Sequence, residues 1–262
     1  MKQRVSAGKE TIYYHRAYRK IFAPEKKIFV LFLSVILLLE SLVFVFFPKL
    51  TYLMSSFSRE VLLSSIASVD IDIVQKNFLF KPIHVLSLPG HFPSKEFSVL
   101  VLVFSLLLMF FISKTRIPKP LSMSVILISS VNVISALFFI FVPHRFPYDL
   151  DTFLVLYSET AIVMWFFIPV VLGFALYPLP SSIWSKALLI VATVCYSIVF
   201  NMFRYIVCTY VLWRFTYLFT ATFYFCFGVL IDVICIVGLY ALYMSMLSKR
   251  IQHDLTVWRW SY

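Results

Sequence analysis

Residues 28–47 read IFVLFLSVILLLESLVFVFF, a continuous apolar run interrupted by one charged residue, Glu40. A helix that crosses the hydrocarbon core of a bilayer needs about 20 such residues. Five later stretches have the same character, and they cover residues 97–113, 121–142, 153–177, 183–212 and 218–247. The sequence therefore predicts an all-α fold, a polytopic transmembrane helix bundle of about six spans.

The composition of the whole chain supports this fold class. Of 262 residues, 61% are hydrophobic, 19% are aromatic and only 13% are charged. A typical soluble domain is about half apolar and about a quarter charged. One water-soluble core could not bury this apolar content, so the chain must use lipid as a solvent. No zinc-finger, P-loop or dinucleotide-binding pattern occurs, so the function must be inferred from weaker signals.

The distribution of basic residues predicts the orientation of the spans. The net charge is +11, and Lys and Arg cluster in residues 1–27, in residues 114–119 and after the last span. In a six-span chain these three segments lie on one side of the membrane, which the positive-inside rule makes cytoplasmic. We therefore expect a cell-membrane protein with both termini in the cytoplasm. In a protein of this class the excess charge indicates topology, and we expect no nucleic-acid partner.

Three regions follow from this topology. Residues 1–27 form a basic cytoplasmic flank, residues 28–247 form the transmembrane domain with an outer loop at 48–96, and residues 248–262 form a cytoplasmic tail. Within the outer loop, apolar residues recur at helical spacing and predict an amphipathic helix; they are Val61, Leu62, Leu63, Ile66, Val69 and Ile73. Prolines such as Pro48 are expected just outside the spans, where a missing N–H costs least.

The cysteines and histidines do not form a recognisable ligand pattern. Cys195, Cys208, Cys226 and Cys235 all fall in the last two spans without a CxxC pair, so we interpret them as packing residues. His84 and His91 share the outer loop, but no third ligand follows at metal-binding spacing. The sequence predicts neither a metal site nor a cofactor.

Polar residues inside the spans are the candidate functional residues, because they are costly at bilayer depth. The five are Glu40, Asn132, Glu159, Arg204 and Asp232. At about 1.5 Å of rise per residue, Glu159 and Arg204 fall in the outer third of the bundle together with Asn201 and Tyr224. Glu40 and Asp232 are expected deeper and away from that layer.

Two interpretations of this polar layer remain open. Glu159 and Arg204 could form an interhelical ion pair, with Asn201 adding a hydrogen bond between helices. Alternatively, the four residues could line a cleft at the outer face, where the planar guanidinium of Arg204 would bind a carbonyl or carboxylate of a substrate or partner.

Short motifs in the last three spans resemble a known family. NMFR at 201–204 resembles the Asn-x-x-Arg motif of exosortases and archaeosortases. YFCFG at 224–228 stands where that family places His-x-x-x-Gly, and SETA at 158–161 stands in the region of its nucleophilic cysteine. The resemblance covers roughly residues 153–242.

The resemblance implies a multi-pass membrane transpeptidase that processes C-terminal sorting signals of exported proteins at the outer face. Such chemistry needs a thiolate, a histidine and an arginine that stabilises the oxyanion. Only Arg204 matches, because Glu159 and its neighbours replace the cysteine and Tyr224 replaces the histidine. The departures favour a relative without catalytic activity.

Three functions are therefore considered. The first is a non-catalytic, exosortase-like protein that binds an exported or membrane-anchored partner, such as the transmembrane segment of another protein, through Glu159, Asn201, Arg204 and Tyr224. The second is an active membrane transpeptidase or hydrolase using Glu159, Arg204 and Tyr224. The third is an assembly subunit of a membrane complex. A transporter is less favoured, because the sequence has no inverted repeat.

Overall fold

The computed structural model describes residues 26–65, 71–115, 117–179 and 181–251, so most of the expected basic flank and of the expected tail lies outside the described residues. Within these ranges, six helical segments are long and apolar enough to cross a membrane, as the sequence predicts. The helices are α2 (Lys26–Ser65), α3 (Lys95–Lys114), α4 (Lys119–Phe141), α5 (Leu150–Leu176), α6 (Ile183–Arg214) and α7 (Ile231–Ile251). The last segment begins with a π-helix, η3 (Thr222–Leu230), which runs directly into α7.

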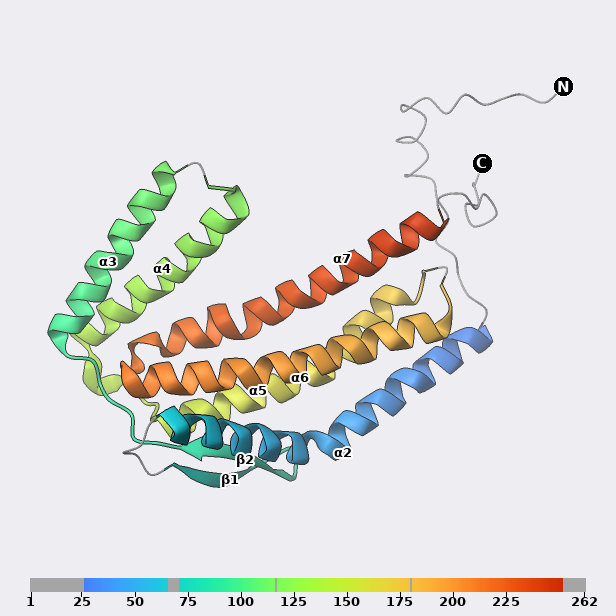
Figure 1. Cartoon of the computed structure of the whole chain (residues 1–262), viewed down its shortest axis with the longest axis horizontal. Coiled ribbons are helices and arrows are strands. Elements are labelled where there is room, and N and C mark those ends of the chain that lie inside the picture. Colours follow the sequence, from blue (N-terminus) through green and yellow to red (C-terminus); the bar gives the residue numbers. More distant parts are fainter. Residues whose placement is uncertain (1–25, 66–70, 116, 180, 252–262) are drawn as a thin grey trace.

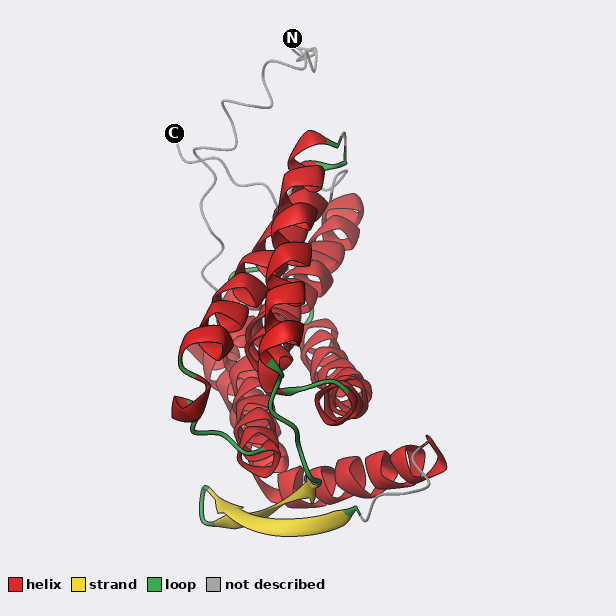
Figure 2. Cartoon of the chain, turned by 90° about the vertical axis from the view of Figure 1, so that its left-hand side faces the viewer, coloured by secondary structure: helices red, strands yellow, loops and turns green. Residues whose placement is uncertain are grey.

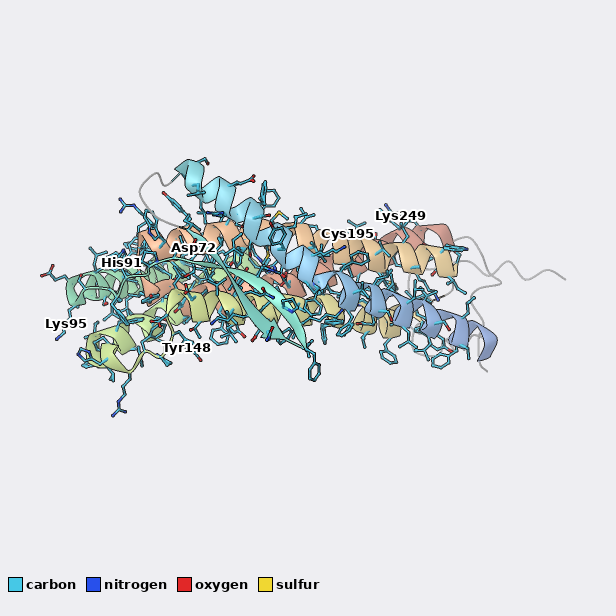
Figure 3. The ribbon with its side chains drawn as sticks, turned by 90° about the horizontal axis from the view of Figure 1, so that it is seen from below. Asp72, His91, Lys95, Tyr148, Cys195 and Lys249 are labelled. Carbon is cyan, nitrogen blue, oxygen red and sulfur yellow. The ribbon has the colours of Figure 1, made fainter. Side chains whose placement is uncertain are left out.

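The elongated molecule has two distinct ends (Figure 1). The start of α2 and the end of α7 lie together at one end, which we call the terminal end. The opposite end carries a two-stranded hairpin and is called the hairpin end. Figure 3 shows Lys249 at the terminal end, and it shows His91, Lys95 and Tyr148 at the hairpin end.

Helix α5 forms the centre of the bundle. Half of its most apolar window is buried, whereas the other spans bury 6–22% of theirs. Its buried face includes Leu154, Ile162, Trp165 and Ile168, each no more than 1% exposed, and it packs against α2 and α6. Helices α3 and α4 instead form an antiparallel arm that leans away from α7 (Figures 1 and 2). The arm joins the bundle through the hairpin-end part of α4, where Ala136 and Phe139 are buried.

Helix α2 continues through Pro48, which we expected to lie outside the first span. Proline has no N–H, so the carbonyl of Phe44 one turn earlier has no helical donor. The ammonium group of Lys81 donates a hydrogen bond to this carbonyl at 2.8 Å. Lys81, from the hairpin that follows, thus supplies the hydrogen-bond donor that the Phe44 carbonyl lacks, and the helix extends to Ser65.

The prediction of an amphipathic helix in the outer loop was only partly right. Val61, Leu62 and Leu63 belong to the last turns of α2 rather than to a separate helix, Ile66 and Val69 lie outside the described residues, and Ile73 is in a strand. The second half of α2 buries Thr51, Ser55 and Ser58. It packs on the hairpin, where the Ser55 hydroxyl donates to the carbonyl of His84 at 2.7 Å.

The hairpin itself was not predicted. Strands β1 (Asp72–Phe78) and β2 (Lys81–Ser87) pair in antiparallel register, from Asp72 opposite Ser87 to Phe78 opposite Lys81. Strand β2 buries Ile83, Val85 and Leu86 against α2 and α5. The two-residue turn has positive φ at Leu79 (48°) and Phe80 (64°). This geometry usually selects Asn-Gly, so a Leu-Phe pair hides the turn from sequence analysis.

Candidate functional site

The candidate site is built around Arg204, which lies in the hairpin-end half of α6 and reaches toward the junction of η3 and α7. One terminal nitrogen, Nη1, donates to the carbonyls of Phe227 and Gly228, both at 2.9 Å. The other, Nη2, donates to Asn201 Oδ1 and to Asp232 Oδ2, also at 2.9 Å. We call these five residues the arginine cluster. It joins α6 to α7 through one side chain.

The arginine cluster is shielded from solvent and lipid. The side chains of Arg204 and Asp232 are 10% and 6% exposed, and Asn201 is 1% exposed. The guanidinium carbon lies 5.2 Å from the ring centroid of Phe200 and 6.0 Å from that of Tyr157. Charge-assisted hydrogen bonds are strong in such apolar surroundings, so the cluster holds the two helices firmly together.

The π-helix explains why backbone carbonyls are available to Arg204. In a π-helix the N–H bonds to the carbonyl five residues earlier, so the change to α-helix at Ile231 displaces the regular bonding pattern. Phe227 and Gly228 lie just before this change, and both carbonyls accept from Arg204. Gly228 also relieves crowding, because a Cβ there would lie 3.2 Å from the carbonyl oxygen of Phe223.

Asp232 does not lie where the sequence predicts it. It was expected deeper than Arg204 and away from it, whereas the two form an ion pair at 2.9 Å. Two assumptions caused the error. A π-helix has more residues per turn and rises less per residue than the assumed α-helix. In addition, α6 extends to Arg214, so Arg204 lies about 15 Å from its hairpin end.

Glu159 does not belong to the arginine cluster. It is half-buried on α5, and the only salt bridge among the described residues is that of Arg204 with Asp232. The Glu159–Arg204 pair, one of the two interpretations left open by the sequence, is therefore not formed in the structure. The interhelical ion pair does exist, with Asn201 as its hydrogen-bonding neighbour, but its carboxylate comes from α7.

Tyr224 makes a second polar contact. Its hydroxyl shares a hydrogen bond with Thr160 Oγ1 at 3.0 Å, which links η3 to α5. The expected polar layer thus divides in two. Asn201 and Arg204 turn toward α7, whereas Tyr224 bonds to Thr160, the residue that follows Glu159 in α5.

The other two polar candidates have separate environments. Asn132 on α4 accepts a hydrogen bond from Thr222 Oγ1 at 2.6 Å and so ties the arm to η3. Glu40 is half-buried on α2 and lines a groove shared with α5. No hydrogen-bond partner for its buried Oε1 exists among the residues that the structure describes.

The four thiols lie in different environments. Cys208 is fully buried one turn beyond Arg204, and Cys226 is 3% exposed in η3. Cys195 is exposed and Cys235 is half-buried, and all four are free thiols. Within the described parts of the chain, His, Cys, Asp and Glu side chains form no group of three or more that could hold a metal ion.

No family model, no curated protein and no solved structure matches the chain. The structure supports a bundle of six apolar, membrane-like helices, and no family match supports the resemblance suggested by the NMFR motif. What identifies the chain as a polytopic membrane protein is its six long, apolar helices.

Proposed function

We propose that this chain is a non-catalytic, exosortase-like membrane protein that binds an exported or membrane-anchored partner near its hairpin end, which faces out of the cytoplasm. The observation that carries the proposal is the set of bonds made by Arg204. Each terminal nitrogen already donates to two acceptors of this chain, and the remaining donor, Nε, is buried without a partner among the described residues. A guanidinium that stabilises a developing oxyanion must have a donor directed at the substrate instead.

In this proposal the four candidate residues have two roles. Asn201 and Arg204 position α6 against α7. Glu159 and Tyr224 form the contact surface, because both are half-buried rather than enclosed. Glu159 also lies close to the lipid-facing stripe of α5, where its neighbour Val163 is 51% exposed. A carboxyl group at such a position is expected to meet a polar or basic group of another molecule.

Photo-crosslinking tests this proposal in cells. A benzophenone amino acid at Val163, one turn from Glu159, should yield a discrete adduct with a membrane or exported protein. Because the contact depends on the carboxylate, Glu159→Gln should reduce the adduct at least about fivefold. Glu96→Gln, an exposed carboxylate at the start of α3, is the matched control and should leave the adduct unchanged. An adduct insensitive to Glu159→Gln, or no adduct at all, would exclude this surface.

A separate measurement tests whether the chain has catalytic activity. If the chain only binds its partner, the C-termini of exported proteins should be identical by mass spectrometry in cells with and without this chain. A C-terminal cleavage that disappears with the chain and with Arg204→Lys would support the transpeptidase instead.

A specific observation also favours the assembly-subunit function. Apart from α5, the spans bury no more than 22% of their apolar windows. The large remaining surface could serve contacts with several other subunits. Purification in mild detergent distinguishes the two: an assembly subunit should copurify with its neighbours at fixed stoichiometry, whereas a partner-binding protein should also be recovered alone.

A further inference from the structure

The two edges of the hairpin differ in how their backbone groups are satisfied. On the outer edge of β2, the N–H of Leu86 donates to the hydroxyl oxygen of Tyr205 at 2.9 Å. The N–H of His84 donates to Thr51 Oγ1 at 3.4 Å, and the carbonyl of His84 accepts from Ser55 Oγ at 2.7 Å. Side chains of α2 and α6 thus take the place of a third strand on this edge.

The outer edge of β1 has no such partners. Opposite residues of an antiparallel pair alternate between those that exchange backbone hydrogen bonds and those whose backbone groups point away from the partner strand. His84 and Leu86 point away on β2. Their partners in the register are Gln75 and Ile73, so these two residues, and Asn77 two positions on, point outward on β1. In the described part of the chain, nothing bonds to the outward N–H and C=O groups of these three residues.

Strand β1 also lacks the features that normally close a free edge. Native proteins bend such edges with bulges, block them with proline or charge, or cover them, because an open edge pairs with another chain. Strand β1 has seven residues, a continuous register and no proline, and its two charges, Asp72 and Lys76, are of opposite sign. Gln75 and Asn77 are exposed and Ile73 is half-buried, so another chain can reach the edge.

The position of the hairpin brings one end of this edge to the membrane surface. The hairpin lies along the outside of the bundle beside α2 (Figures 1 and 2), with Asp72 toward the hairpin end (Figure 3). At the tip, the Lys81 ammonium group bonds to the carbonyl of Phe44, which lies about 27 Å along α2 from Lys26. This distance is close to the thickness of the hydrocarbon core, about 30 Å, and the fully exposed ring of Phe80 at the tip suits that boundary. From there β1 extends about 20 Å.

We propose that the free edge of β1 pairs with an extended segment of a membrane-anchored partner, namely the segment next to its transmembrane helix on the outer side. The inference rests on the proposed function, because it requires that the hairpin end faces outward and receives such a partner. Backbone groups on alternate residues, about 6.8 Å apart, match the repeat of another extended chain. The position of the edge selects the segment, because a strand paired with β1 has one end at the bilayer surface.

Binding of defined peptides tests the proposal. Full-length protein carrying a donor fluorophore is placed in phosphatidylcholine vesicles with a polyleucine transmembrane peptide. The peptide carries an acceptor and, at one end, a seven-residue segment of alternating threonine and valine. In a second peptide, N-methyl groups replace the amide hydrogens of this segment, so the side chains are the same but the backbone cannot donate. Energy transfer should show at least about tenfold tighter binding of the unmethylated peptide, since several backbone hydrogen bonds are at stake.

Two further measurements identify the edge. Gln75→Pro removes an outward N–H without removing a bond between the strands, as Pro82 already does on β2, and should abolish the preference. Gln75→Val keeps the N–H and is the matched control. Amide exchange in the native protein does not depend on the folding of a variant. The unmethylated peptide should slow exchange at Ile73, Gln75 and Asn77 at least about tenfold. Lys76, whose N–H already bonds to β2, should change little.

Equal binding of the two peptides to the native protein, or a preference that survives Gln75→Pro, would overturn the proposal. Energy transfer between two copies of this chain that Gln75→Pro removes would also overturn it, because a second copy would then occupy the edge. Failure here is distinguishable from failure of the proposed function. An adduct at Val163 that depends on Glu159, together with equal binding of the two peptides, would retain the partner surface on α5 and exclude the strand pairing.

Discussion

At the scale of single residues, Arg204 shows how a membrane bundle uses a charge for assembly. The guanidinium is surrounded by two carbonyls, an amide and a carboxylate, and is flanked by aromatic rings. Removing one partner of a buried ion pair leaves the other charge uncompensated, which costs about 3–5 kcal/mol in soluble proteins. Replacing both partners by apolar residues avoids that cost.

We therefore expect Arg204→Met and Asp232→Leu each to destabilise the protein by several kcal/mol, on the order of 3 kcal/mol. The double variant should be more stable than either single variant, because no unpaired charge remains. Unfolding in mixed micelles of increasing dodecyl sulfate content measures these differences. Arg214→Met, at the exposed end of α6, is the matched control and should change stability by no more than about 0.5 kcal/mol. Strictly additive effects of the two single substitutions would show that the pair is not coupled.

At the scale of elements, the break of α2 at Pro48 and the hairpin form one unit. The carbonyl that proline leaves free accepts from Lys81, whose ammonium group also lies 4.0 Å from the ring centroid of Phe44. The hairpin thus completes a hydrogen bond that the helix lacks. This contact fixes the tip of the hairpin against the side of the span.

This coupling predicts a non-additive pair of substitutions. Lys81→Met should destabilise the native protein by about 1–2 kcal/mol, because it leaves the carbonyl without a donor. In a Pro48→Ala background the restored N–H supplies that donor, so the same substitution should cost at least about 1 kcal/mol less. Unfolding titrations of the four proteins give the coupling energy directly. Lys76→Met, an exposed lysine of β1, should cost the same in both backgrounds.

The turn of the hairpin carries local backbone strain. Leu79 and Phe80 both have positive φ, a conformation that bulky residues adopt at a cost of about 1–3 kcal/mol each. Phe80 is fully exposed, so its side chain gains little from contacts within the chain. We expect Leu79→Asn combined with Phe80→Gly to stabilise the protein by about 1 kcal/mol or more, measured as a higher melting temperature in detergent. A lower melting temperature would indicate that Phe80 has a stabilising contact with lipid.

At the scale of the whole molecule, the positions of the two ends predict a sidedness that labelling can measure. The hairpin and the start of α3 lie at one end, and the start of α2 and the end of α7 lie at the other (Figures 1 and 3). Gln75→Cys, on exposed β1, should react with a membrane-impermeant maleimide in intact cells. Lys249→Cys should react only after permeabilisation. The unsubstituted chain controls for its own thiols, and the reverse pattern would invert the proposed topology.

Most of the helical architecture follows from the sequence, because lipid requires long apolar runs and each run is visible by itself. The departures arise where a distant contact replaces a local signal. Pro48 should end a helix, but Lys81 from the hairpin supplies the missing donor. The Leu-Phe turn lacks the residues that usually mark a hairpin. Neither feature could be predicted from the residues next to it in the sequence.

The central residues of the candidate site could be predicted from the sequence, but the carboxylate that pairs with Arg204 could not. Arg204 and Asn201 stand out as polar residues in an apolar helix, and the structure joins them. Whether Glu159 or Asp232 pairs with Arg204 depended on the depth of each residue along its helix. A π-helix changes that depth, and an apolar sequence does not show that the helix is a π-helix. Glu40 was visible as a charge within the first span, whereas its groove depends on how α2 and α5 pack.

The arginine cluster has a consequence for how the chain is made. Arg204 and Asp232 lie on successive spans, so during synthesis the arginine reaches the insertion machinery before its partner has left the ribosome. A lone arginine or aspartate at the centre of a helix opposes insertion by about 2.5–3.5 kcal/mol. The two spans should therefore enter the bilayer together, as a helical pair whose charges are already matched. Stalling translation between them should leave α6 beside the translocation channel rather than released into lipid.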